Sequence, residues 1–136
     1  MARRIARPIH VVVAWLFVIG LLYQVFLAGM GVFDSSSAFG THRDTGYVLT
    51  LVPVVLAVTA FAGRFGWRHV GAAIVMLGQF ILQSLLVLQR DSAPPIAALH
   101  PVNGVLILVI AAWLASDAWR RFNADEPAPA EPSPEA

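Results

Sequence analysis

Residues 9–33 read IHVVVAWLFVIGLLYQVFLAGMGVF and contain no Asp, Glu, Lys or Arg. About 20 apolar residues in a helix cross the ~30 Å hydrocarbon core of a bilayer, so this stretch is long enough to span it. Three arginines before it give it the look of a secretory signal sequence. The run is too long for one, however, and residues 30–33 would make a poor cleavage site. We therefore expect a retained transmembrane helix.

Three further stretches have the same apolar character, at about residues 42–63, 67–88 and 98–119. The connections between them are short, so neighbouring helices should run antiparallel. The sequence thus predicts an all-α fold, an integral membrane four-helix up-down bundle formed by residues 1–123. Residues 124–136 are rich in Pro, Ala and Glu without apolar periodicity, and we expect a disordered tail there.

Composition supports a lipid environment and excludes several kinds of site. Of the 136 residues, 58% are hydrophobic and 12% are charged, against roughly 25% charged in soluble domains. The absence of cysteine excludes thiolate-bound iron–sulfur clusters, Cys-type zinc sites and covalently attached haem. A net charge of +1 gives no reason to expect nucleic-acid binding.

The arginines predict the orientation in the membrane. Seven lie on the side that carries both termini: Arg3, Arg4, Arg7, Arg64, Arg68, Arg120 and Arg121. Arg43 and Arg90 lie on the other side. Because positive residues concentrate in the cytoplasm, we expect both termini there, in a multi-pass protein of a bacterial inner membrane. We name the end with the termini the inner end and the opposite end the outer end.

Two prolines bear on helix geometry. Pro53 frees the carbonyl of Leu49 and predicts a kink in the second helix. Pro101 disfavours helical geometry at His100. Either His100 caps the fourth helix, or that helix begins near Pro95 and kinks at Pro101.

The two halves of the chain echo each other weakly. The segment ending in Gln24 resembles the segment ending in Gln79, and His42-x-x-x-Gly46 resembles His100-x-x-x-Gly104. A true duplication and a chance match in a biased composition both remain open at this point.

Polar side chains gather in one layer near the outer end. Gln24, Gln79 and Gln83 lie in the outer halves of the first and third helices, and His42 and His100 open the second and fourth. Intramembrane polar residues are costly unless they have a partner or a task. This layer is therefore the candidate site.

His42 and His100 should face each other, because the second and fourth helices of an up-down bundle lie diagonally across its core. Two neutral imidazoles across a bundle can serve as the axial ligands of a b-type haem. Gly46 and Gly104 follow one turn deeper on the same face and would leave room for a flat macrocycle. We expect one haem b per chain, with a quinone as an alternative flat ligand.

Two arginines could complete the site, and a second histidine pair could form another. Arg43 and Arg90 are suited to bind haem propionates as bidentate partners. His10 and His69 lie at the inner ends of the first and third helices, with no polar layer expected around them. We do not expect a second haem there.

Every one of these features also has a structural explanation. Boundary histidines are often interfacial, glutamines can form interhelical hydrogen bonds, and glycines can permit close helix packing. On that interpretation the chain is a cofactor-free accessory subunit.

Three short motifs resemble one four-helix half of haem A synthase: QVFLAG at 24–29, HRDTGY at 42–47 and LHPVNG at 99–104. In that family each half holds haem between histidines of its second and fourth helices. The resemblance implies that His42 and His100 are the ligands here.

The chain departs from that family in three respects. It has four predicted helices where the family has eight, it has no cysteine pair, and residues 37–41 (SAFGT) lack the acidic residue before the first histidine. The resemblance therefore implies shared haem binding without the oxidising chemistry. The chain also resembles small uncharacterised four-helix bacterial membrane proteins that carry His-Arg-x-x-Gly-Tyr.

The expectation is a membrane b-type haem protein that transfers electrons or serves as a haem-bearing subunit of a respiratory assembly. It would sit in the lipid bilayer as a homo-oligomer or within a larger complex, and it would not be an enzyme by itself. The alternatives are the cofactor-free subunit and a haem-modifying enzyme formed by dimerisation.

Overall fold

The computed structural model describes residues 1–124, and within them every regular element is a helix. The elements are α1 Ala2–Phe33, α2 Ala38–Leu49, α3 Val52–Gly63, α4 Trp67–Leu88, α5 Pro94–Ala97 and α6 Leu99–Ala124. They form four helical units that are long and apolar enough to cross a membrane, with α2 and α3 in one unit and α5 and α6 in another. The predicted four-helix bundle is confirmed, and its apolar helices make the chain a multi-pass membrane protein.

The helices run further than the sequence predicted. α1 begins at Ala2, not at residue 9, and the second unit begins at Ala38, not at residue 42. Arginines do not end a helix at the membrane surface, because their long stems can bury while the charged heads stay in water. The predicted tail falls outside the described residues except for Ala124, where α6 ends.

The second unit is broken between α2 and α3, as Pro53 predicted. Proline has no N–H to give to the carbonyl of Leu49, and the regular helix is interrupted at Thr50 and Leu51, where the Leu51 N–H bonds to the Val48 carbonyl three residues back. The Thr50 hydroxyl donates to the Gly46 carbonyl at 3.0 Å, a bond that favours bending. The kink lets α2 and α3 pack against different neighbours.

The fourth unit matches the second alternative for Pro101 only in part: it begins near Pro95 as expected, but its break does not lie at Pro101. A short helix, α5, begins at Pro94, and the break comes at Ala98, before α6 starts at Leu99. His100 therefore lies in the first turn of α6. Pro101 follows in that turn, where a missing N–H costs little.

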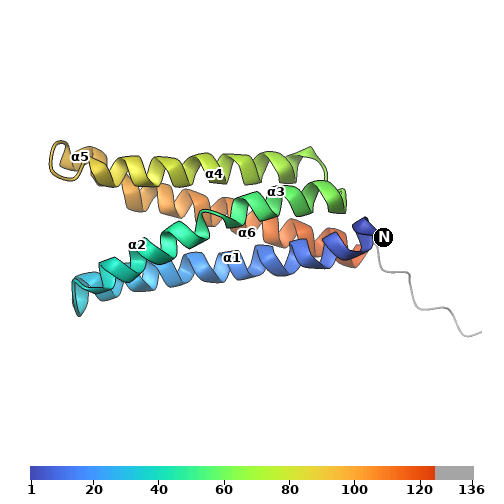
Figure 1. Cartoon of the computed structure of the whole chain (residues 1–136), viewed down its shortest axis with the longest axis horizontal. Coiled ribbons are helices and arrows are strands. Elements are labelled where there is room, and N and C mark those ends of the chain that lie inside the picture. The colour runs from blue at the N-terminus through green and yellow to red at the C-terminus, as the bar shows by residue number, and fades with distance from the viewer. Residues whose placement is uncertain (125–136) are drawn as a thin grey trace, which may run out of the picture.

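The packing order places the second and fourth units on a diagonal. α1 packs against α2, α3 and α6, while α4 packs against α3 and α6 (Figure 1). Among the described residues, the backbones of α2 and α3 do not approach that of α6, and the backbone of α1 does not approach that of α4. Side chains still meet across these diagonals, as His10 and His69 do between α1 and α4. Both termini of the described chain lie at one end, as an up-down bundle requires (Figure 1).

The core fills the inner and middle parts of the bundle. Its largest fully buried apolar side chains are Phe17, Leu56, Met76, Ile107 and Leu114. In α2, by contrast, only Leu49 is buried. Because α2 packs on α1 and its backbone approaches neither α4 nor α6, the outer part of the bundle is packed less closely than the rest.

Candidate functional site

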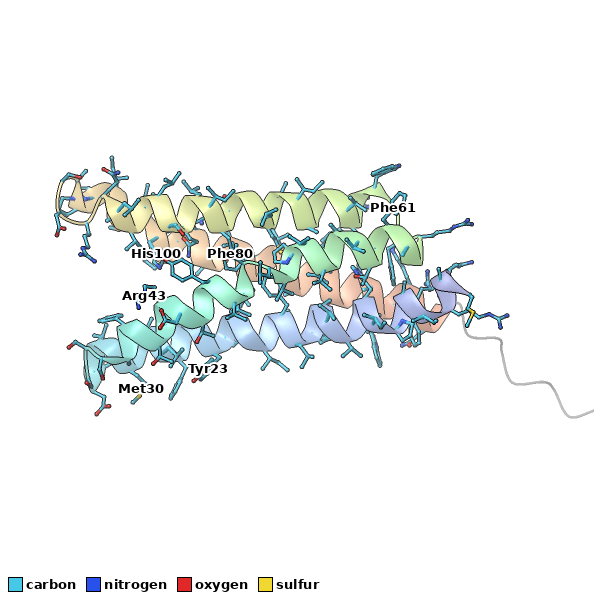
Figure 2. The ribbon with its side chains drawn as sticks, in the orientation of Figure 1. Tyr23, Met30, Arg43, Phe61, Phe80 and His100 are labelled. Atoms are coloured by element: carbon cyan, nitrogen blue, oxygen red, sulfur yellow. The ribbon has the colours of Figure 1, made fainter. Side chains whose placement is uncertain are left out.

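The structure brings the two outer histidines together. His42 from α2 and His100 from α6 are both half-buried, and their ring centroids lie 6.1 Å apart with the ring planes inclined by 64°. Figure 2 shows His100 at the same end of the bundle as Arg43. Two diagonal helices thus bring their histidine rings close together across the bundle, in an edge-on arrangement.

A backbone carbonyl orients each of these rings. His42 Nδ1 donates to the Gln24 carbonyl at 3.0 Å, and His100 Nδ1 donates to the Gln83 carbonyl at 3.2 Å. A carbonyl oxygen can only accept, so the proton of each neutral ring is on Nδ1 and Nε2 keeps a lone pair. Metal-binding histidines commonly have this arrangement, with the second nitrogen fixed by a backbone carbonyl.

The two glycines make room, but glutamine side chains use it. A Cβ on Gly46 would lie 3.8 Å from Gln24 Oε1, and a Cβ on Gly104 would lie 3.3 Å from Gln83 Nε2. The ends of two flexible side chains therefore occupy this space, and room for a macrocycle beside these glycines stays a prediction. The pairing also corrects the repeat, because the counterpart of Gln24 in the second half is Gln83 and not Gln79.

Asn103 in α6 is hydrogen-bonded to the two glutamines of this layer that lie in α4. It is 4% exposed, and its Nδ2 donates to the Gln79 carbonyl and to Gln83 Oε1, both at 2.9 Å. Gln79 thus takes part through its backbone. Among the described residues, the buried side-chain polar atoms without a hydrogen-bond partner are Gln24 Nε2 and Asn103 Oδ1. Both belong to this layer, which offers one unused donor and one unused acceptor.

Among residues 1–124, no contact joins either outer arginine, Arg43 or Arg90, to His42 or His100. Arg43 binds Asp44 at 2.8 Å and Arg90 binds Asp91 at 3.3 Å, and the arginine side chains are 65% and 73% exposed. Each pairs with the residue that follows it. A role in binding propionates stays a prediction for both.

The inner histidines form a buried polar chain, contrary to the expectation that no polar layer surrounds them. His10 and His69 are fully buried, and His10 Nε2 lies 3.1 Å from His69 Nδ1. His10 Nδ1 lies 2.9 Å from Thr59 Oγ1, and His69 Nε2 lies 2.9 Å from Asp117 Oδ2. The chain Thr59–His10–His69–Asp117 takes one residue from each helical unit.

The hydrogen bonds of the inner histidines leave no room for an iron between their two rings. Two metal–nitrogen bonds of about 2 Å each need the nitrogens about 4 Å apart, and His10 Nε2 and His69 Nδ1 are 3.1 Å apart. All four ring nitrogens of the pair already have hydrogen-bond partners. The two histidine pairs therefore differ in kind.

Asp117, the acidic member of this hydrogen-bonded chain, was not among the predicted site residues. The signal was present, because Asp117 lies within the apolar stretch 98–119 and an intramembrane carboxylate is a candidate functional group by default. Thr59 is a polar residue in the inner half of the second predicted helix. Neither sequence position indicates by itself that these residues meet.

Metal ions without a macrocycle are not favoured. Within residues 1–124, no group of three or more His, Cys, Asp or Glu side chains could hold a metal ion. A haem supplies four ligands of its own and asks the protein for one or two. The outer pair matches that requirement.

The comparisons with known proteins give one partial match, to a family whose function is unknown. No curated protein and no solved structure matches the chain. Residues 24–90 are similar to a family described as a family of unknown function, DUF6220. This segment contains His42 and Gln83 and ends before His100.

Proposed function

We propose that the chain is a membrane b-type haem protein that binds one haem b between His42 and His100. The observation that carries the proposal is the matched orientation of two imidazoles. Each comes from a different diagonal helix, is held through Nδ1 by a backbone carbonyl, and keeps Nε2 free to bind a metal.

The separation of the rings supports a shared iron. A metal between two imidazoles adds about 2 Å to each nitrogen, and each nitrogen lies about 1 Å from its ring centre, which gives roughly 6 Å between centres. The observed value is 6.1 Å. His42 and His100 are therefore at a separation at which they would hold one metal between them.

The surroundings also suit a large flat ligand. The end groups of Gln24 and Gln83 cover the glycines, and both belong to flexible side chains that can turn aside. Gln24 Nε2 and Asn103 Oδ1 are buried and lack partners, which is costly unless a ligand or water satisfies them. The residues present therefore fit a haem.

A bound haem would supply reversible one-electron chemistry at its iron. The protein residues would hold and orient it: His42 and His100 as ligands, and the Gln24 and Gln83 carbonyls as the groups that fix the rings. We place the protein in a bacterial inner membrane, as an electron carrier or a haem-bearing subunit of a larger assembly.

A second candidate function rests on the same layer. The glutamines fill the space above the glycines, and Asn103 bridges two turns of α4. Such bonds can serve only to fix helix packing. The chain would then be a cofactor-free accessory subunit.

An absorption spectrum of the purified chain separates the two functions. For the proposal we expect a Soret band, with sharp α and β bands on reduction, in the chain expressed with sufficient haem supply. A colourless protein that also fails to bind added haem would contradict the proposal and favour the accessory subunit. A bound quinone would give ultraviolet absorption without a Soret band, which also contradicts it.

A further inference from the structure

We propose that Thr59, His10, His69 and Asp117 form a proton-binding chain that takes up one added proton, whose charge the two imidazoles share through the hydrogen bond between them. This inference is independent of the haem site, because the chain lies in the inner half of the bundle. Along α1, His10 and Gln24 are 14 residues apart, about 21 Å at 1.5 Å per residue.

The positions of the protons on two neutral rings follow from what Asp117 and Thr59, at the two ends of the hydrogen-bonded chain, can accept or donate. Asp117 receives hydrogen bonds from the guanidinium groups of Arg120 and Arg121, so it is a carboxylate and can only accept. His69 Nε2 must then carry a proton. If both rings are neutral, His69 Nδ1 accepts from His10 Nε2–H, and His10 Nδ1 accepts from the Thr59 hydroxyl. Every bond in this state points toward Asp117.

A second state holds one more proton with the same contacts. The Thr59 hydroxyl turns and donates to the Val55 carbonyl, 2.8 Å away, and the added proton occupies His10 Nδ1, which now donates to Thr59. The proton between His10 Nε2 and His69 Nδ1 can then belong to either ring. Between the two states only one hydroxyl rotates, and no polar atom loses its partner.

A third state with two added protons is excluded by geometry. It would place an N–H of His10 against an N–H of His69 across 3.1 Å, with no acceptor between them. Nearby charges act in the same direction: Arg7 lies over Phe65, which stacks on both rings, and Arg68 lies over Trp113, which contacts His69. Asp117 is the negative charge that favours the first added proton. The hydrogen-bonded chain can therefore hold one added proton but not two.

The chain reaches water at its Asp117 end. The Asp117 side chain is 16% exposed and is bound to Arg121. Arg121 also lines an open pocket of about 240 Å³ together with Arg3, Arg7, Arg64 and Ala124. On the other side of Thr59 lies the apolar core, including Phe17, Leu56 and Met76. Within the described residues, Asp117 is therefore the member of this hydrogen-bonded chain that lies next to the inner-face pocket.

The number of protonated ring nitrogens tests the proposal. The double variant His42→Ala/His100→Ala leaves His10 and His69 as the sole histidines of the full chain, and it removes the proposed haem ligands from the measurement. Histidine-specific ¹⁵N labelling in lipid nanodiscs then resolves four ring nitrogens. We expect two of them protonated at neutral pH and three on acidification, with coupling through the inter-ring hydrogen bond. Two throughout, until helicity is lost, or all four together would overturn the proposal.

The variant Asp117→Asn tests whether the charge of Asp117 supports the added proton or whether Asp117 only provides a structural hydrogen bond. An amide oxygen can still accept from His69 Nε2 but carries no charge, so we expect the third protonated nitrogen to be lost over the same pH range. Asp117→Glu should retain it, and Asp91→Asn, the same change on an exposed residue, should leave it unaltered. Retention of the charged state in a folded Asp117→Asn protein would overturn the proposal.

Discussion

The two histidine pairs show how the same side chain takes different roles through its partners. In the outer pair, carbonyls occupy Nδ1 of His42 and His100 and leave Nε2 with a lone pair. In the inner pair, His10 and His69 bind each other and have partners at both outer nitrogens. Only the outer pair can offer ligands to iron without losing hydrogen bonds.

Gly46 and Gly104 determine how much space is left beside the outer histidines. A leucine at position 104 would displace Gln83, and one at position 46 would press on Gln24 with slightly more room. Overpacking costs about 1–3 kcal/mol, and 1.4 kcal/mol is about tenfold in affinity. We expect Gly104→Leu and Gly46→Leu to lower haem affinity about tenfold or more, with the larger loss at position 104.

The measurement is the haem-to-protein ratio beside membrane expression. Leucine adds no polar group, so expression should stay near normal. Gly78→Leu is the control, because nothing lies within 4 Å of the added Cβ there. Full haem occupancy in both test variants would remove these glycines from the site.

At the scale of elements, the break between α2 and α3 decides where His42 lies. α3 packs against α1 and α4, whereas α2 continues along α1 without reaching α4. An unbroken helix would carry α2, and His42 with it, in another direction relative to α6. The kink is therefore part of the site although Pro53 is far from it in the chain.

Pro53→Ala tests this dependence. Alanine restores the N–H that the Leu49 carbonyl lacks, so residues 38–63 should straighten. The chain has no cysteine, so spin labels at Thr41→Cys and Leu99→Cys report the distance between the two histidine-bearing turns. We expect a shifted distance distribution and a lower haem content. Pro8→Ala in α1, which stays helical through Pro8, should change neither; an unshifted distribution in Pro53→Ala would show that the kink has another cause.

At the scale of the whole molecule, the arginines predict how the bundle sits in the membrane. Seven lie at the end with both termini and two at the other. A phosphatase fused to Ala136 should be inactive and a fluorescent protein fused there should fluoresce. Phosphatase activity would place the termini outside and would reverse the sides assigned to both histidine pairs.

Much of this architecture was predictable, since spans and breaks depend on local composition. The four apolar runs and Pro53 predicted the helices and the kink. Helix starts were misjudged at Ala2 and Ala38, because arginines and small residues can continue a helix at the interface.

The polar partners were predictable only in part. The depth of His42 and His100 follows from counting residues along helices. Helix rotation does not, so the sequence could not indicate that Gln83 rather than Gln79 pairs with His100, or that Asp117 meets His69. Such contacts depend on side-chain direction across four helices.

Single variants of the two proposed ligands test whether His42 and His100 together bind one haem. We expect His42→Ala and His100→Ala each to abolish or severely lower the haem-to-protein ratio and to remove the sharp α band of the reduced protein, because one axial ligand is lost. The neighbouring changes Thr41→Ala and Leu99→Ala, at exposed residues of the same turns, should leave both unchanged. An unaltered haem content and reduced spectrum in either histidine variant would contradict the account.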